Sequence, residues 1–136
     1  MRSAFIFTTC SDVAQLSDDL RNAGFSESAP GVFTYASQDR EIIWAYIASD
    51  IPELSAIERE ELQRAGAGSF LNVIGFDISG RLSELDVARE LIRQVACRQE
   101  SVLMDDFSDI VWRREDICDR HKNGRGFLEP PLTGNN

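Results

Sequence analysis

Residues 118–125, CDRHKNGR, combine side chains that a nucleophilic thiol site would use. Cys118 could act as the nucleophile, and Arg120, His121 and Arg125 could supply the positive field that favours a thiolate. The spacing is close to a C-x-x-x-x-x-R phosphate loop, but six residues rather than five separate Cys118 from Arg125. Acidic residues rather than a buried strand precede Cys118. We therefore interpret the match as accidental and expect no enzymatic activity.

The single histidine and three cysteines limit the metal sites that this chain can build. A structural zinc site needs about four nitrogen or sulfur ligands, and Cys118 with His121 forms only one C-x-x-H pair. The acids Asp105, Asp106 and Asp109 lack the central glycine and terminal glutamate of an EF-hand calcium loop. Dinucleotide and Walker phosphate-binding patterns are missing as well. We expect neither a metal nor a cofactor.

The composition is that of a globular domain, with 136 residues, 43% of them hydrophobic and 27% charged. No apolar run is long enough to span a bilayer, so we expect a cytoplasmic protein. Cys10, Cys97 and Cys118 are odd in number and far apart, which predicts reduced thiols, with Cys97 buried on a helix.

Apolar periodicity predicts an α+β fold with the order βαββαβαββ. Ser11 and Ser83 are the expected N-caps of the first and third helices. The strands are expected at residues 5–8, 32–36, 42–47, 70–78, 102–104 and 110–112, and the helices at 11–23, 54–65 and 83–95. This order is a ferredoxin-like βαββαβ sandwich extended by a further helix and a β-hairpin. We expect one domain over residues 1–118 and a polar, loosely ordered tail over residues 119–136.

Negative charge is concentrated in two places. The net charge is −9, and residues 1–61 carry −7 of it. Such a field repels nucleic acid and anionic membranes and accelerates encounter with a basic protein. We therefore predict that a partner binds at two acidic surfaces. One is the start and outer face of the second helix, and the other is the turn between the last two strands, which a tryptophan and two arginines follow. The predicted partner-binding residues are Asp50, Glu53, Glu58, Glu60, Glu61, Asp105, Asp106, Asp109, Trp112, Arg113 and Arg114.

Residues 82–117, LSELDVARELIRQVACRQESVLMDDFSDIVWRREDI, resemble the C-terminal half of bacterial immunity proteins of polymorphic-toxin and contact-dependent-inhibition systems. The resemblance lies in an amphipathic helix, a short strand, paired aspartates, an Ile-Val-Trp strand and a further acidic stretch. It implies an intracellular protein that binds a cognate toxin, commonly a basic nuclease or deaminase, and occludes its active site. It carries over no catalytic residues.

These observations predict a toxin-neutralising binding protein that contacts neither nucleic acid nor membrane directly. The alternative is a small-molecule sensor or small enzyme with a pocket between the sheet and the helices. A ligand-dependent thermal shift would favour this alternative.

Overall fold

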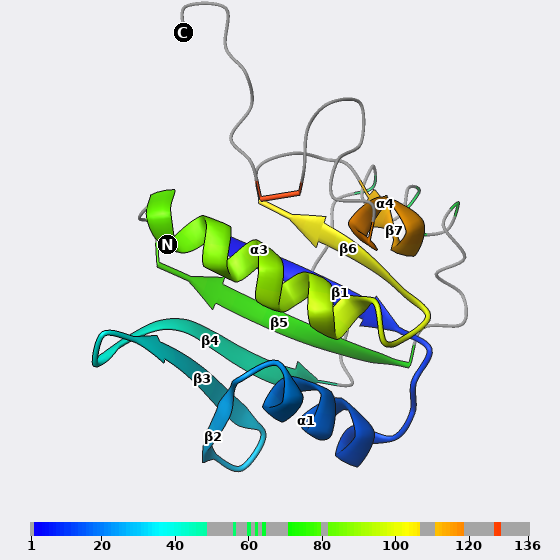
Figure 1. Cartoon of the computed structure of the whole chain (residues 1–136). Helices are drawn as coiled ribbons and strands as arrows, with labels where there is room; N and C mark the ends of the chain where they lie inside the picture. Colours follow the sequence, from blue (N-terminus) through cyan, green and yellow to red (C-terminus); the bar gives the residue numbers. More distant parts are fainter. Residues whose placement is uncertain are drawn as a thin grey trace, which may run out of the picture.

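The computed structural model describes residues 2–48, 56, 60, 62, 64, 71–79, 82–106, 111–118 and 127–128. Within these residues the fold is α+β, with a seven-stranded antiparallel sheet and three helices (Figure 1). The strands are β1 (Arg2–Thr8), β2 (Ser26–Ala29), β3 (Val32–Ser37), β4 (Arg40–Ala48), β5 (Asn72–Ile78), β6 (Ser101–Asp105) and β7 (Val111–Arg113); the helices are α1 (Val13–Asn22), α3 (Leu82–Ala96) and α4 (Arg114–Cys118). The helical residues Ala56, Glu60, Leu62 and Arg64 lie where the second helix was predicted.

The strand order of the sheet is β2-β3-β4-β5-β1-β6-β7. This order differs from that of a ferredoxin-like sheet built from the predicted strands, because in such a sheet residues 42–47 lie beside the first strand. Instead β4 pairs with β5, while β1 lies between β5 and β6. The predicted hairpins are confirmed, because β3 pairs with β4 and β6 pairs with β7.

Helices α1 and α3 lie on the same face of the sheet (Figure 1). The side chains of β1 alternate, so that Ala4 and Ile6 join the large core beneath these helices, whereas Phe7 faces the other side. The large core receives Leu16 and Leu20 from α1 and an apolar stripe from α3: Leu85, Ala88, Leu91, Ile92 and Val95. A smaller cluster on the opposite face contains Phe7, Leu62, Val73, Val102, Met104 and Val111. The helix face therefore contains most of the described core.

Local details differ from the sequence prediction in four places. Asp12, rather than Ser11, is the N-cap of α1, because its carboxylate accepts hydrogen bonds from the backbone N–H groups of Ala14 and Gln15. Helix α3 already includes Ser83, which therefore is not its cap. The strand β2 and the short helix α4 were not predicted.

Two residues of the predicted tail, Phe127 and Leu128, belong to the folded domain. Phe127 and Leu128 are fully buried in the large core, and the ring of Phe127 meets that of Trp112 edge-on. The core therefore receives residues from beyond the predicted domain. The remainder of 119–136 lies outside the described residues, and its loose order stays a prediction.

A close approach between β4 and β5 makes Gly75 sensitive to substitution. The ring of Tyr46 lies across the backbone of Gly75, at the place where a Cβ atom would be. Burial of Tyr46, together with the nearby charge of Asp77, raises the pKa of its hydroxyl. We expect Gly75→Ala to displace the ring and lower the free energy of unfolding by about 1–3 kcal/mol. Urea unfolding measures this change.

The matched control is the same substitution without the tyrosine ring. In a Tyr46→Ala background, Gly75→Ala should cost little, since the obstructing atoms are gone. An equal loss of stability in both backgrounds would contradict steric overlap as the cause.

Candidate functional site

Strand β6 separates the predicted binding residues into two groups. Arg113 pairs with Val102 near the start of β6, whereas Asp105 is at its end, opposite Ala4. Since a strand advances by about 3.3 Å per residue, the two ends of β6 lie about 13 Å apart. Arg113 and Arg114 therefore do not share one patch with Asp105 and Asp106.

Asp105 was predicted to be a solvent-facing carboxylate of the turn, and the structure buries it. The side chain is 7% exposed and accepts a hydrogen bond of 2.7 Å from the backbone N–H of Leu128. The expectation of an exposed acid is wrong because its side chain shares the helix-covered face with Ala4. Asp106 is exposed and accepts a hydrogen bond from the backbone N–H of Ser3.

Trp112 was expected to be a surface anchor and is instead 1% exposed. It belongs to the large core and contacts Phe127. Its position follows from the register of β7, which sets Trp112 opposite Leu103 on the helix-covered face. As placed here, Trp112 is a core residue and presents almost no surface to a partner.

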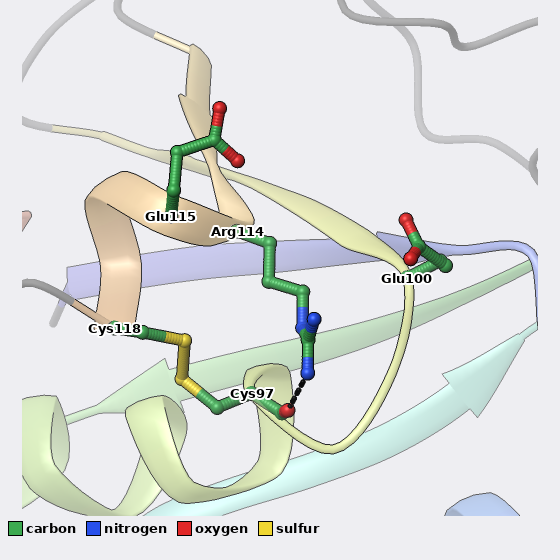
Figure 2. A pocket seen from close by; sticks show the side chains of 5 residues that line it. All are labelled: Cys97, Glu100, Arg114, Glu115 and Cys118. Carbon is green, nitrogen blue, oxygen red and sulfur yellow. Dashed lines mark hydrogen bonds between the residues drawn. A yellow bond between two sulfur atoms is a disulfide. The ribbon is translucent and has the colours of Figure 1, made fainter.

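A surface hollow of about 400 Å³ lies between α4 and the turn that joins α3 to β6. Its lining residues are Cys97, Glu100, Arg114, Glu115 and Cys118 (Figure 2). Of these, only Arg114 was among the predicted binding residues. The hollow is not between the sheet and the helices, where the alternative function would place its pocket.

Both walls of the hollow are tied to the core. In the turn, Ser101 donates its hydroxyl to the backbone oxygen of Ala96, and the backbone N–H of Thr9 donates to the backbone oxygen of Glu100. The buried Gln99 donates a 3.0 Å hydrogen bond to the carboxylate of Asp19 on α1. These bonds attach the turn and the first residue of β6 to α3, to the residue that follows β1 and to α1.

The opposite wall is α4, which is attached through three different interactions. Ile117 is fully buried, and its backbone oxygen accepts a 3.2 Å hydrogen bond from Arg93 Nε. Arg114 reaches across the hollow and donates a 2.5 Å hydrogen bond to the backbone oxygen of Cys97 (Figure 2). A disulfide joins Cys97 to Cys118.

This disulfide corrects the prediction of reduced thiols. Cys97 and Cys118 are 21 positions apart in sequence, yet their Cα atoms lie 6.0 Å apart, within the normal range for a disulfide. Cys97 is half-buried in the turn after α3 rather than buried on the helix. Cys118 is engaged and is no free nucleophile in this state; Cys10 is the free cysteine.

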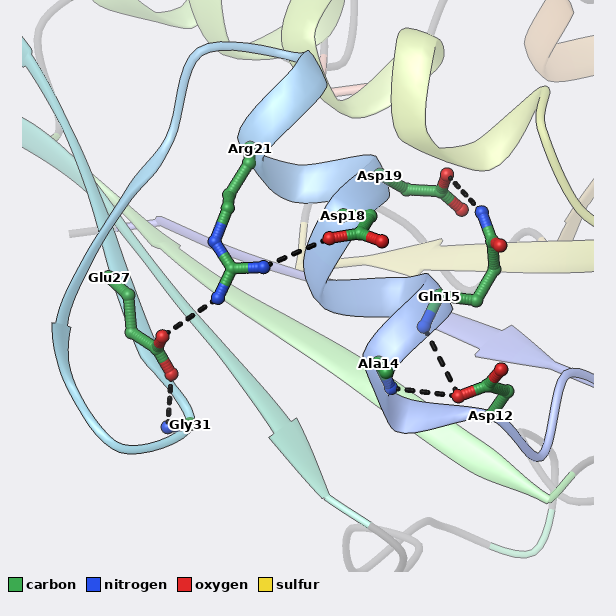
Figure 3. Close-up of polar contacts among 8 residues, drawn as sticks. All are labelled: Asp12, Ala14, Gln15, Asp18, Asp19, Arg21, Glu27 and Gly31. Atoms are coloured by element: carbon green, nitrogen blue, oxygen red, sulfur yellow. Dashed lines mark hydrogen bonds and ion pairs between the residues drawn. The ribbon is translucent and has the colours of Figure 1, made fainter.

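Intramolecular ion pairs neutralise several of the described charges. Arg21 pairs with Asp18 and with Glu27 (Figure 3). The N–H of Gly31 and then the guanidinium of Arg21 lower the pKa of Glu27. Further pairs join Arg40 to Glu84, Arg89 to Asp86 and Arg93 to Glu90. These acids are already engaged within the molecule.

Glu100 and Glu115 differ from those acids. Both are exposed, and within the described part of the chain neither side chain has a hydrogen-bond or ion-pair partner. Figure 2 shows them on either side of Arg114, whose guanidinium points towards Cys97. The hollow thus presents two available carboxylates and one restrained cation, a formal balance of −1. Sequence reasoning missed Glu100 and Glu115 as a pair. The one sequence feature that could have indicated them is that Cys97 precedes and Cys118 follows the β6–β7 hairpin.

No protein-family model, curated protein or solved structure matches this chain. Within the described residues, no group of three or more His, Cys, Asp or Glu side chains could hold a metal ion. None of the described helices has the length and apolar character to cross a membrane.

Most of the remaining predicted residues lie outside the part of the chain that the structure describes. Glu60 is helical and exposed. The guanidinium of Arg113 donates a 3.4 Å hydrogen bond to the backbone oxygen of Arg64. Asp50, Glu53, Glu58, Glu61, Asp109 and His121 lie outside the described residues.

Proposed function

We propose that this protein is an immunity protein that binds a cognate toxin with a basic surface and occludes the toxin's active site. The observation that carries the proposal is the pair of available carboxylates, Glu100 and Glu115, on the Cys97–Cys118 hollow. The overall charge of −9 supports it, because a field of this sign steers a basic protein towards the surface.

The arrangement of the hollow suits a lysine or arginine side chain of the partner. Carboxylates that are free of internal partners need lose only water to pair with an incoming cation, whereas Asp18 or Glu90 would have to break an existing ion pair. Both walls are held by hydrogen bonds and a disulfide, which lowers the entropy that binding must remove. Arg114 is restrained by its hydrogen bond to the Cys97 carbonyl, and its guanidinium can donate hydrogen bonds to a carboxylate of the partner.

The direct test of the function is co-expression with the product of the neighbouring gene. We expect the protein to rescue host growth from that product and to co-purify with it. Growth arrest that the protein does not relieve, with no co-purification, would contradict the immunity function.

The site is tested by removing its charges without changing its shape. We expect the double variant Glu100→Gln, Glu115→Gln to associate with the toxin about tenfold more slowly at low salt, with a weaker dependence on salt. Stopped-flow or surface-based kinetics measures the association rate constant.

Glu41 provides the matched control. It is exposed, has no partner among the described residues and lies on the β3–β4 hairpin. Glu41→Gln combined with Asp39→Asn removes the same charge and should change the association rate much less. Equal slowing by both double variants would assign the effect to net charge and remove the hollow from the interface.

We also propose that β1, α1, β4, β5, α3 and β6 together form a ferredoxin-like unit. Support comes from the two interleaved crossovers: β5 lies between β1 and β4, and β1 lies between β5 and β6. In this interpretation β2, β3 and β7 are additions to the unit. Its second and third strands are β4 and β5, whereas the prediction gave these places to residues 32–36 and 42–47.

A further inference from the structure

We propose that the Cys97–Cys118 disulfide is a reducible latch on α4, opened by a dithiol reductant and closed by oxidation. The latch itself rests only on the contacts of α4; its consequence for toxin binding rests on the function proposed above. A cytoplasmic protein would meet reducing conditions, and disulfides that form there are commonly transient or redox-sensing.

The disulfide is accessible from solvent. Cys118 is exposed, Cys97 is half-buried, and both line the hollow of about 400 Å³. This volume falls within the range of pockets that hold small ligands, so a small dithiol can enter. Figure 2 shows the two sulfur atoms along one wall, with no other labelled side chain between them and the hollow. Attack is therefore expected at the Sγ atom of Cys118.

Arg114 favours the reaction by its position. Its guanidinium donates a hydrogen bond to the backbone oxygen of Cys97, which places a permanent positive charge on the residue whose sulfur leaves. A thiolate of the dithiol attacks Cys118 Sγ, the S–S bond breaks, and Cys97 leaves as a thiolate. The second thiol then displaces Cys118 and closes the oxidised dithiol into a ring. In total the protein gains two electrons and two protons, and the dithiol loses them.

Helix α4 depends on outside contacts more than the other helices do. It has five residues, so that few of its backbone groups can find partners within the helix. Apart from the disulfide, its described contacts include the burial of Ile117, hydrogen bonds from Arg93 and Arg114, and the hydrogen bond that Asp116 accepts from the backbone N–H of Arg113. By contrast, β1 is paired over its whole length with β5 and over most of it with β6. Reduction is therefore expected to release α4 and leave the sheet folded.

Release of α4 changes the hollow directly. Glu115 belongs to α4, and Glu100 belongs to the turn that Ser101 and Gln99 hold in place. With the latch closed, the two carboxylates keep a fixed separation. With the latch open, only a fraction of molecules present both in the binding geometry, and the apparent affinity falls in proportion to that fraction.

Hydrogen exchange on the full chain, with and without dithiothreitol, tests the latch. Mass spectrometry after alkylation confirms that Cys97 and Cys118 have become thiols. We expect the amides of residues 114–118 to exchange about tenfold faster after reduction, while those of β1 and β5 stay protected and lose no more protection than the global stability that the disulfide contributes. Unchanged exchange at residues 114–118, complete loss of protection in β1 and β5, or resistance of the disulfide to dithiothreitol would each overturn the proposal.

Two sets of variants sharpen the test. Cys97→Ser with Cys118→Ser should reproduce the exchange of the reduced protein, and Cys10→Ser should behave as the wild type. Arg114→Gln should slow the rate of reduction several-fold, and Arg114→Lys should restore part of it, because the charge favours the leaving thiolate. Equal rates for Gln and Lys variants would overturn the role of Arg114.

The binding consequence has its own measurement. Toxin affinity that is about tenfold weaker after reduction supports control of the site by the latch. A protein that opens its latch but binds the toxin equally in both states would overturn that control. A protein that opens its latch and binds no neighbouring gene product in either state would overturn the immunity function and leave the latch established.

Discussion

Replacement of Trp112 by alanine is expected to lower the free energy of unfolding by about 3–5 kcal/mol, the usual cost of removing a large buried aromatic side chain. Trp112 is 1% exposed, joins the large core and contacts the ring of Phe127. The cavity would open between β7 and the buried Phe127–Leu128 segment. Chemical unfolding followed by circular dichroism measures the loss.

Trp112→Phe serves as the conservative comparison. Among the described residues, the indole Nε1 of Trp112 is buried without a hydrogen-bond partner, so the phenylalanine variant also removes an unsatisfied donor. That gain offsets part of the lost packing, and we expect a loss well below that of the alanine variant. A Trp112→Ala protein of unchanged stability would show that the side chain is not in the core.

Removal of the disulfide is expected to have the second largest effect. Cys97 and Cys118 enclose a loop with a sequence separation of 21. Loop-closure entropy then predicts that Cys97→Ser with Cys118→Ser lowers the free energy of unfolding by about 3 kcal/mol. Urea unfolding at constant pH measures the difference. A stable domain has about 5–15 kcal/mol to lose, so we expect the variant to remain folded at 25 °C.

The free cysteine provides the control for this result. Cys10 is partly buried beside the large core and forms no disulfide. Cys10→Ser should therefore change stability by much less than the double variant. Equal losses for the two would indicate that the sulfur atoms act through packing and that the covalent bond contributes little.

The sequence predicted the elements whose apolar pattern is strong. Runs of apolar, aromatic and β-branched residues identified β1, β3, β4, β6 and β7, and alternation identified β5. The apolar stripe predicted for α3 matches the residues that the large core contains. Strand β2 was not predicted, because all four of its residues are exposed and it pairs with β3 through its backbone. Helix α4 escaped because five residues are too few to show a period.

The sheet order and the site depend on contacts between distant residues, which local patterns do not encode. Asp105 was predicted in a polar turn, but the partner that buries it is the backbone of Leu128, 23 positions further along. The odd number of cysteines suggested free thiols, although two of them meet once α3 and α4 pack. Arg114 was correctly placed at the surface, and the carboxylates beside it become a pair only through the fold.

The central position of β1 has a consequence for the time at which the chain can fold. Phe5 pairs with Gly75 on one side and with Met104 on the other, so both neighbours of the first strand come from the second half of the sequence. Contacts of such long range slow folding. During synthesis, Ile6 and Phe7 must wait until about residue 105 has left the ribosome before they can be buried on both sides, and until then they are open to non-native association. The sheet can therefore be completed only late in the synthesis of the chain.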